Sequence, residues 1–289
     1  MLPFSPCRAG HWRVRERTLP CPARPLLMGI VNVTPDSFSD GGRFFDASAA
    51  VAHGVELAEH GADLLDIGGE STRLYAQPVP ADEELRRVAP VIERLAREVA
   101  IPLSIDTSKA VVAREAIDAG AAIINDTTGL ADPAMIETAA ETGAGVCVMH
   151  MRGTPRSMQD APAYSDVVAE VGAFLRQRRD TLVSQGIALD CIALDPGIGI
   201  GFGKTAEHNL ELLRHAAELH ALGCPVLVGH SRKQFIGQVL GDPRTDRLAG
   251  TIGAALALAR SGVQILRVHD VEPVAHALAL FAAAGGLEP

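Results

Sequence analysis

Eight short apolar runs alternate with eight longer amphipathic stretches along the chain, and this alternation restricts its fold more than any other feature. The runs are rich in valine, isoleucine and leucine and show no polar alternation, which is typical of strands buried on both faces of a parallel sheet. We therefore expect eight parallel strands. They are predicted at residues 26–31, 64–67, 103–105, 122–124, 146–149, 192–194, 226–228 and 265–268.

The amphipathic stretches between the runs have the periodicity of surface helices. In one of them, Leu85, Val88 and Ile92 repeat at helical spacing, with glutamate and arginine on the opposite face. A strict eightfold alternation of strand and helix favours a closed barrel over an open doubly wound sheet, and such a barrel takes about 250 residues as one domain. We predict an α/β protein, a single (β/α)8 TIM barrel over residues 25–289. Its helices are expected at 47–60, 81–99, 109–119, 133–141, 165–185, 207–222, 244–260 and 273–284.

Residues 1–24 precede the first apolar run and form a short N-terminal extension outside the predicted barrel. Two structures are open for this extension: a hairpin that covers the barrel floor, or a partly disordered segment. The extension has no apolar segment of the kind found in secretory signals, so a cytoplasmic protein is expected. Its basic residues are Arg8, Arg13, Arg15, Arg17 and Arg24.

The acidic balance of the chain argues against nucleic acid as a partner. There are 35 acidic and 26 basic residues, a net charge of −9, whereas a protein that binds the phosphate backbone needs a positive field. No apolar run reaches the ~18 residues of a membrane-spanning helix, so no membrane partner is expected. The five cysteines are odd in number and form no C-x-x-C pair, which fits free thiols in a reducing cytoplasm.

Polar residues follow each of the predicted strands. Active sites of (β/α)8 barrels gather at the carboxyl ends of the strands, so these residues are expected to meet at one mouth. Carboxylates and a carboxamide suit a flat ring that bears amide and amino groups, while Arg267, His269 and Asn32 suit phosphate oxygens. Asn32 or a nearby aspartate could also meet Mg²⁺. The strand-end groups are Asn32, residues 68–73, Asp106, Asn125, Asp126, His150, Asp195, His230, Ser231, Lys233, Arg267, His269 and Asp270.

Each of these residues, taken singly, also has an ordinary structural interpretation. Asp106 could cap the following helix, residues 195–197 form a common turn sequence, and His150 could be a core histidine. The glycine-rich stretch 197–205 is not a phosphate loop, because the required first glycine is replaced by Ile198. The convergence of all eight strand ends on one mouth favours a binding site.

Eight segments in a fixed order carry a family resemblance over the chain from about Leu26 to the C-terminus. With these segments the sequence resembles the dihydropteroate synthases of the pterin-binding barrel family. The first and last of them are the most specific. The segments are residues 28–42, 66–73, 104–109, 124–126, 149–151, 195–199, 229–233 and 267–270.

The resemblance implies a transferase of folate biosynthesis. It would join (7,8-dihydropterin-6-yl)methyl diphosphate to 4-aminobenzoate, giving 7,8-dihydropteroate and diphosphate with Mg²⁺ as cofactor. The leaving diphosphate would be stabilised and no covalent nucleophile would be needed, which agrees with the absence of a convincing nucleophile–base pair. The resemblance further implies a homodimer whose partners are these small molecules.

The resemblance also implies a role for each matching residue, and two loops, 33–43 and 69–80, would close over the reactants. Residues expected at the pterin ring are Asp106, Asn125, Met149, Asp195, Gly229, Lys233 and Arg267. Those expected at the diphosphate are Asn32, Arg267 and His269, with Asn32 also at the metal. Those expected at the aminobenzoate are Phe38, Thr72, Arg73, Phe202 and Ser231. The group with catalytic roles is Asn32, Asp36, Arg73, Lys233, Arg267 and His269.

Two departures from the family pattern affect the aminobenzoate side. Leu74 and Tyr75 stand where the family usually has Pro-Gly, and a duplicated Ile-Gly pair lengthens the glycine loop by two residues. Whether Ile200 or Phe202 packs on aminobenzoate is left open, as is the response to sulfonamides. Two alternatives accompany the leading hypothesis. One is a pterin-binding relative without turnover, and the other is a methyltetrahydrofolate-dependent methyltransferase, which shares the barrel but not the 231–233 and 267–269 patterns.

Overall fold

The sheet of this computed structural model has eight parallel strands in the order β8-β7-β6-β5-β4-β3-β10-β9. The structure describes residues 8–34, 47–71, 77–153, 162–242 and 244–287. The sheet curls until β8 meets β9, where Leu194 bridges Val226 and its amide donates to the carbonyl of Pro225 at 2.9 Å. This confirms the predicted barrel fold. The strands are β3 (Leu26–Asn32), β4 (Leu64–Gly68), β5 (Leu103–Asp106), β6 (Ile123–Asp126), β7 (Gly145–Met149), β8 (Ile192–Asp195), β9 (Leu227–Val228) and β10 (Ile265–Val268).

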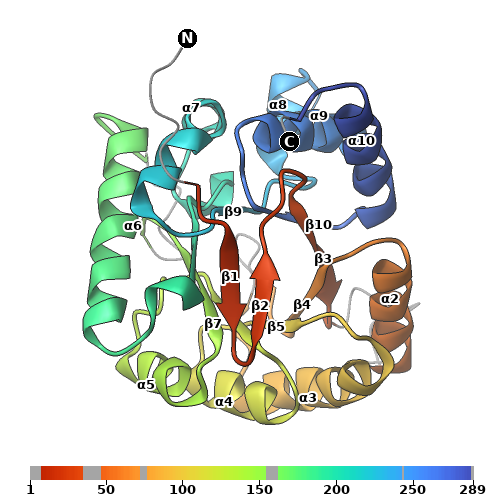
Figure 1. Ribbon diagram of the computed structural model, residues 1–289, viewed down its shortest axis with the longest axis vertical. Coiled ribbons are helices and arrows are strands. Elements are labelled where there is room, and N and C mark those ends of the chain that lie inside the picture. Colours follow the sequence, from red (N-terminus) through yellow and green to blue (C-terminus); the bar gives the residue numbers. More distant parts are fainter. Residues whose placement is uncertain (1–7, 35–46, 72–76, 154–161, 243, 288–289) are drawn as a thin grey trace.

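Helices ring the sheet, and Figure 1 shows them around the outside of the barrel. The outward side chains of the strands, such as Leu65, Ile105 and Val146, join the helices in one large apolar core. The helices are α2 (Ala47–Glu59), α3 (Ala81–Glu98), α4 (Ala110–Asp118), α5 (Pro133–Thr142), α6 (Val167–Ser184), α7 (Ala206–Arg214), α8 (Gln234–Val239), α9 (Leu248–Arg260) and α10 (Val271–Ala283), with the 3-10 turns η1 (Leu189–Cys191), η2 (Ile200–Phe202) and η3 (Ala216–Leu222).

The eight strands lie where the apolar runs predict them, but three helical predictions differ from the structure. The stretch 207–222 is not one helix, because α7 ends at Arg214, with His215 as its C-cap, and the chain continues as η3. The stretch 244–260 becomes helical only at Leu248, and the unpredicted six-residue α8 precedes it. Finally, α10 starts at Val271, since Pro273 is tolerated in the first turn of a helix.

The barrel interior is built in two layers that follow the two-residue period of the strands. The lower layer is apolar and includes Leu64, Ile123, Ala193 and Ile265. Two residues further along the same strands, the interior positions become polar. These upper positions are Asp66, Asn125, Asp195 and Arg267. The sheet therefore places its polar interior side chains at the carboxyl ends of the strands.

An antiparallel hairpin of β1 (His11–Val14) and β2 (Arg17–Pro20) covers the lower end of the barrel, as Figure 1 shows. Trp12 is fully buried against the lower layer, and its Nε1 donates to the carbonyl of Cys191 at 2.9 Å. Val14 packs on Gly145, where a Cβ atom would come within 2.5 Å of the valine. The hairpin thus closes the floor and leaves the other end for chemistry.

The five arginines of the extension each bind a different part of the barrel floor. Their partners are carbonyl oxygens or carboxylates around the floor, so this positive charge is used inside the molecule. The pairs are Arg8 with Gly262 at 2.7 Å, Arg13 with Asp190 at 3.0 Å, Arg15 with Ala121 at 3.4 Å, Arg17 with Ala100 at 2.6 Å and Arg24 with Asp63 at 3.0 Å.

Candidate active site

Arg267 lies at the centre of the upper layer and joins two carboxylates. Its Nε donates to Asp66 Oδ2 at 2.5 Å, and its terminal nitrogen donates to Asp106 Oδ2 at 2.7 Å. Asn125 Nδ2 donates to the same oxygen of Asp66 at 3.0 Å. Burial opposes the positive charge of Arg267, but the two carboxylates outweigh burial and raise its pKa. The guanidinium therefore stays charged and holds three strands together at the mouth.

Asp66 is the residue of this cluster to which sequence reasoning gave no role. It lies inside β4 rather than after the apolar run, so inspection of the strand ends passed over it. The alternation within β4 contains the missing signal, because Asp66 stands two residues after the inward Leu64 and is fully buried.

The carboxyl group of Asp106, which binds Arg267, has a raised pKa. Burial raises the pKa of its carboxyl to about 7; Arg267 opposes the shift, and the charges of Asp66, Asp126 and Glu84 add to it. Asp106 thus titrates near neutral pH in the ligand-free protein, and its proton is available to a ligand that needs either an acceptor or a donor.

Asp195 and Lys233 form the opposite side of the mouth. Asp195 Oδ1 accepts a hydrogen bond from the Gly197 amide at 2.7 Å, and burial raises the pKa of this carboxyl. Lys233 donates to the carbonyl of Ile198, and burial lowers the pKa of its ammonium to about 8. A Cβ atom at Gly229 would lie 3.8 Å from Lys233 Nζ and from the side chain of Arg267, so this glycine lies next to both residues.

The lengthened glycine loop lies beside Lys233. Phe202, at the end of η2, is 9% exposed, and its ring centroid lies 4.5 Å from Lys233 Nζ. Ile200 packs against the large apolar core instead. Gly197 has a φ of 70° and passes so close to the His150 carbonyl that a Cβ atom would stand 1.9 Å from that oxygen. The loop therefore presents Phe202, rather than Ile200, beside the Lys233 cation.

Lys204 anchors the end of this loop and is only 1% exposed. Its Nζ contacts His150 Nδ1 at 3.0 Å and the carbonyls of His150 and Phe202 at 3.3 Å each. Burial lowers the pKa of Lys204 to about 7 and that of His150 to about 3. His150 is thus a neutral core histidine, and Lys204 is held by protein groups.

Ser231 and His269 meet where the loop after β9 faces the end of β10. The hydroxyl of Ser231 accepts from the backbone amide of His269 at 3.2 Å and lies 3.1 Å from Nδ1 of the same residue. Burial, followed by the charges of Arg267 and Arg232, lowers the pKa of His269 to about 4. The imidazole is therefore neutral at physiological pH and can donate through one ring nitrogen.

The remaining predicted residues are placed as follows. Asn32 ends β3, half-buried and in register with Gly68, and Met149 ends β7 with 5% exposure. The described residues include no cluster of three or more histidine, cysteine, aspartate or glutamate side chains able to hold a metal ion. The predicted residues Asp36, Phe38, Thr72 and Arg73 lie outside the described residues, as do Leu74 and Tyr75.

A second group of charged side chains lies next to the mouth, and sequence reasoning placed only Glu70 of this group at a strand end. Lys109 pairs with Glu70 and, at 2.5 Å, with the fully buried Glu84. Glu70 also accepts from the backbone amide of Val79 at 3.3 Å. Burial works against the ammonium, but both carboxylates outweigh it and raise the pKa of Lys109. This cluster ties β4, α3 and α4 together beside the mouth.

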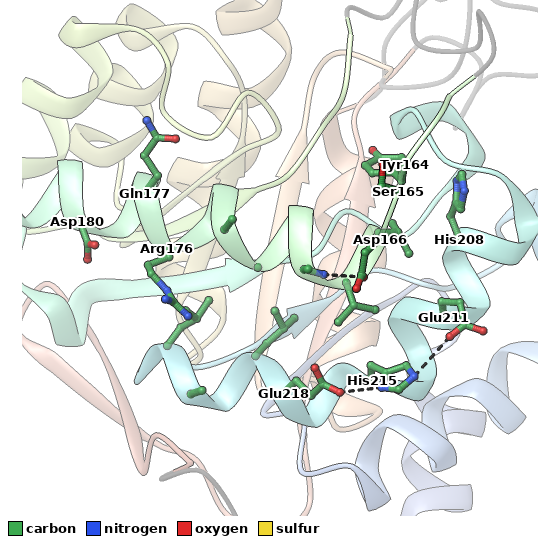
Figure 2. A pocket seen from close by; sticks show the side chains of 18 of the residues that line it. Tyr164, Ser165, Asp166, Arg176, Gln177, Asp180, His208, Glu211, His215 and Glu218 are labelled. Carbon is green, nitrogen blue, oxygen red and sulfur yellow. Dashed lines mark hydrogen bonds and ion pairs between the residues drawn. The ribbon is translucent and has the colours of Figure 1, made fainter.

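A groove of about 1240 Å³ lies elsewhere, on the outer surface between α6 and the pair α7 and η3. Figure 2 shows His215 between Glu211 and Glu218, on the side of the groove formed by α7 and η3, with the nearer carboxylate, Glu218, 2.8 Å away. None of the predicted site residues lines this groove. The chemistry of the strand ends is therefore in a different place from this groove.

Comparison with known proteins agrees with the fold and with the strand-end motifs. The profile of the family described as pterin binding enzyme matches residues 28–269. The dihydropteroate synthase of Escherichia coli K12 is 46% identical over 256 residues, which span 89% of this chain and 90% of that protein. No helix in the described part of the chain is long and apolar enough to cross a membrane.

Two solved structures from Xanthomonas albilineans extend the agreement to three dimensions. One, a dihydropteroate synthase with 4-aminobenzoic acid, is 48% identical with a TM-score of 0.88 and covers 96% of this chain and 98% of its own. The other, in complex with 7,8-dihydropteroate, is 47% identical with a TM-score of 0.85 and covers 95% and 98%. The chain therefore belongs to the pterin-binding enzyme family, among its dihydropteroate synthases.

Proposed function

We propose that the chain condenses (7,8-dihydropterin-6-yl)methyl diphosphate with 4-aminobenzoate, giving 7,8-dihydropteroate and diphosphate. The observation that carries this proposal is the meeting of two carboxylates, Asp106 and Asp195, and the Asn125 carboxamide at one barrel mouth. The cations Arg267 and Lys233 lie at the same mouth. The related structures that contain 4-aminobenzoic acid and 7,8-dihydropteroate support the same substrates.

The pterin ring is assigned to the deeper part of the mouth. A pterin edge is rich in N–H donors, and the carboxylates of Asp106 and Asp195 are acceptors of the kind that binds such an edge. Lys233 would donate to the ring carbonyl, because its ammonium is close enough to Asp195 and Arg267 for their charges to act on its pKa. Asn125, Met149 and Gly229 complete the slot in this proposal.

The diphosphate is assigned to the side of the mouth where β3 and β10 end. Arg267 supplies a permanent positive charge and neutral His269 a ring N–H donor. Asn32 offers a carboxamide oxygen, which fits Mg²⁺, since this ion often takes one or two protein oxygens together with substrate phosphates. A bound Mg²⁺ would neutralise part of the charge of the leaving diphosphate. Asp36, which the family pattern adds here, lies outside the described residues.

The reaction itself needs the site to stabilise charge rather than to form a covalent intermediate. The bond between the methylene carbon and the diphosphate oxygen breaks, and both electrons leave with diphosphate. The amine nitrogen of aminobenzoate attacks the positively charged methylene and then loses one proton to water or diphosphate. Arg267 and His269 stabilise the leaving oxygens, while the buried mouth keeps water from the cation.

The aminobenzoate is assigned to the outer part of the mouth, next to the glycine loop. Phe202 would pack on its ring, because Phe202 faces Lys233 while Ile200 turns to the core. Ser231 would face the same substrate, together with Phe38, Thr72 and Arg73, which lie outside the described residues.

The test is coupling of the pterin diphosphate to 4-aminobenzoate by the purified chain, followed by detection of dihydropteroate. Product is expected with Mg²⁺, and chelation of the metal with EDTA should stop turnover. Pterin binding without product would favour the non-catalytic pterin binder. Methyl transfer from methyltetrahydrofolate, without dihydropteroate formation, would favour the methyltransferase.

We further propose that the chain acts as a homodimer in the cytoplasm. The four described cysteines, Cys21, Cys147, Cys191 and Cys224, are all buried and unpaired, which suits a reducing compartment. Light scattering on the purified chain would test the oligomeric state, because a mass of about 61 kDa, twice the 30.4 kDa of one chain, is expected for a dimer.

A further inference from the structure

We propose that Asp66 is a positioning residue of the pterin site. Through a single carboxylate oxygen it fixes the orientation of both the Arg267 guanidinium and the Asn125 carboxamide. This inference rests on the proposed function, because it concerns how the same mouth recognises the same ring.

The geometry joins three strands through one atom. Asp66 projects from β4 into the barrel and is fully buried. Its Oδ2 receives Arg267 Nε from β10 at 2.5 Å and Asn125 Nδ2 from β6 at 3.0 Å. Arg267 reaches Asp106 on β5 with its terminal nitrogen at 2.7 Å, so both ends of its guanidinium plane are set by carboxylates.

The contact with Asp66 also decides which atom Asn125 presents to a ligand. A carboxamide can offer either an oxygen acceptor or an NH₂ donor, whereas an ionised carboxylate accepts only. Because Asp66 accepts, the NH₂ group of Asn125 must face the barrel interior. Its carbonyl oxygen is then directed away from Asp66 and joins Asp106 as an acceptor for ring N–H groups.

A purely structural role explains this arrangement less well. Replacing a buried ion pair by apolar residues is often neutral or stabilising, so the pair by itself is weak evidence for stability. Within the described residues, the second oxygen of Asp66 is buried and has no hydrogen-bond partner, which is a cost to folding. An acceptor at this point helps the site to recognise the pterin ring, because it prevents the Asn125 carboxamide from rotating by half a turn and exchanging its oxygen with its NH₂ group.

The first test is binding of 6-hydroxymethylpterin to the purified chain, followed by pterin fluorescence. Asp66→Asn keeps the size of the side chain but lets it donate as well as accept, so Asn125 can rotate and Arg267 loses one charged partner. We expect the pterin affinity to fall roughly tenfold to a hundredfold, as for the loss of a hydrogen bond to a charged group.

Asp63→Asn is the matched control. Asp63 also accepts from an arginine, but at the floor of the barrel, where its carboxylate receives Arg24 at 3.0 Å and the amide of Leu27 at 2.8 Å. The same chemical change there should leave the pterin affinity within about threefold of wild type. An equal loss in both variants would show that Asp66 acts only on the fold and would overturn the inference.

The second test separates positioning from structure by a double-mutant cycle. If Asp66 acts through Asn125, then Asp66→Asn should weaken pterin binding much less in the Asn125→Ala background than in the wild type. Additive losses would contradict the proposal. Asp66→Ser gives the same comparison if Asp66→Asn does not fold. A wild-type chain that binds no pterin would instead refute the proposed function, so the two failures are distinct.

Discussion

At the scale of single residues, burial has moved the pKa values of two opposed groups toward neutrality. The pKa of Asp106 is raised to about 7 and that of Lys233 is lowered to about 8. Binding as assigned needs Asp106 ionised and Lys233 protonated. We predict that the affinity for 6-hydroxymethylpterin is bell-shaped in pH. The affinity should fall when the pH drops below about 7 and when the pH rises above about 8. The apparent pKa values of this profile belong to the whole cluster of interacting groups.

Replacing Lys233 should remove one side of the bell-shaped dependence of pterin affinity on pH. Lys233→Arg keeps a cation at all these pH values, so the decline above about pH 8 should disappear while the decline below about pH 7 stays. A wild-type affinity that does not change between about pH 5.5 and about pH 9.5 would contradict the assignment of both groups.

Phe202 and Ile200 offer a second test at this scale. Phe202→Ala removes the ring beside Lys233, so it should raise the KM for aminobenzoate by roughly tenfold and that for the pterin by less. Ile200→Ala, which lies in the same turn but packs on the core, should change stability more than either KM. The opposite pattern, with Ile200→Ala raising the aminobenzoate KM, would assign the ring contact to Ile200.

At the scale of elements, the N-terminal hairpin acts as the floor of the barrel. Trp12 is fully buried against the lower interior layer, so Trp12→Ala should lower the free energy of unfolding by about 3–5 kcal/mol. The pterin KM of the folded enzyme should not change, because Trp12 packs on the lower interior layer, whereas the mouth residues lie at the carboxyl ends of the strands. Urea unfolding and steady-state kinetics measure the two effects.

Trp12→Phe is the control for this change. It keeps most of the apolar volume and removes mainly the hydrogen bond to Cys191, so it should destabilise by less than Trp12→Ala. If truncation of the hairpin up to Pro20 left the unfolding midpoint unchanged, the hairpin would not have the structural role assigned to it.

The elements also show what can be predicted from sequence. The strands were predictable because buried parallel strands leave unbroken apolar runs, and β9 was found although it has only two residues. The six-residue α8 was missed, since so short a helix leaves no periodic pattern, and the break at His215 carries no proline or glycine as a signal. The partners of the Arg267 side chain could not be predicted from the sequence either, because Asp66 on β4 and Asp106 on β5 are 201 and 161 positions away.

At the scale of the whole molecule, the barrel separates stability from chemistry along its axis. The apolar lower layer and the hairpin form one end, and the buried charges form the other. Five arginines tie the floor to the surrounding loops, whereas the mouth gathers carboxylates and cations whose burial opposes their charge. The buried charges of the mouth lower the stability of the fold, and a functional site is often less stable than it could be because its function needs such groups.

Asp195 makes this trade-off measurable. Burial raises the pKa of this carboxyl, so the folded state disfavours the ionised carboxylate. The resulting loss of stability is absent at low pH, where the carboxyl is protonated in both states. It grows as the pH rises from the pKa of the unfolded chain through the pKa of the folded protein. Asp195→Asn keeps an acceptor for the Gly197 amide but removes the charge. We predict that this variant melts at a higher temperature than the wild type at pH 8, that its advantage disappears toward about pH 4, and that its pterin affinity is much reduced. A melting temperature below that of the wild type at pH 8 would mean that the attraction of Lys233 and Arg267 outweighs burial, and that the mouth stabilises the fold.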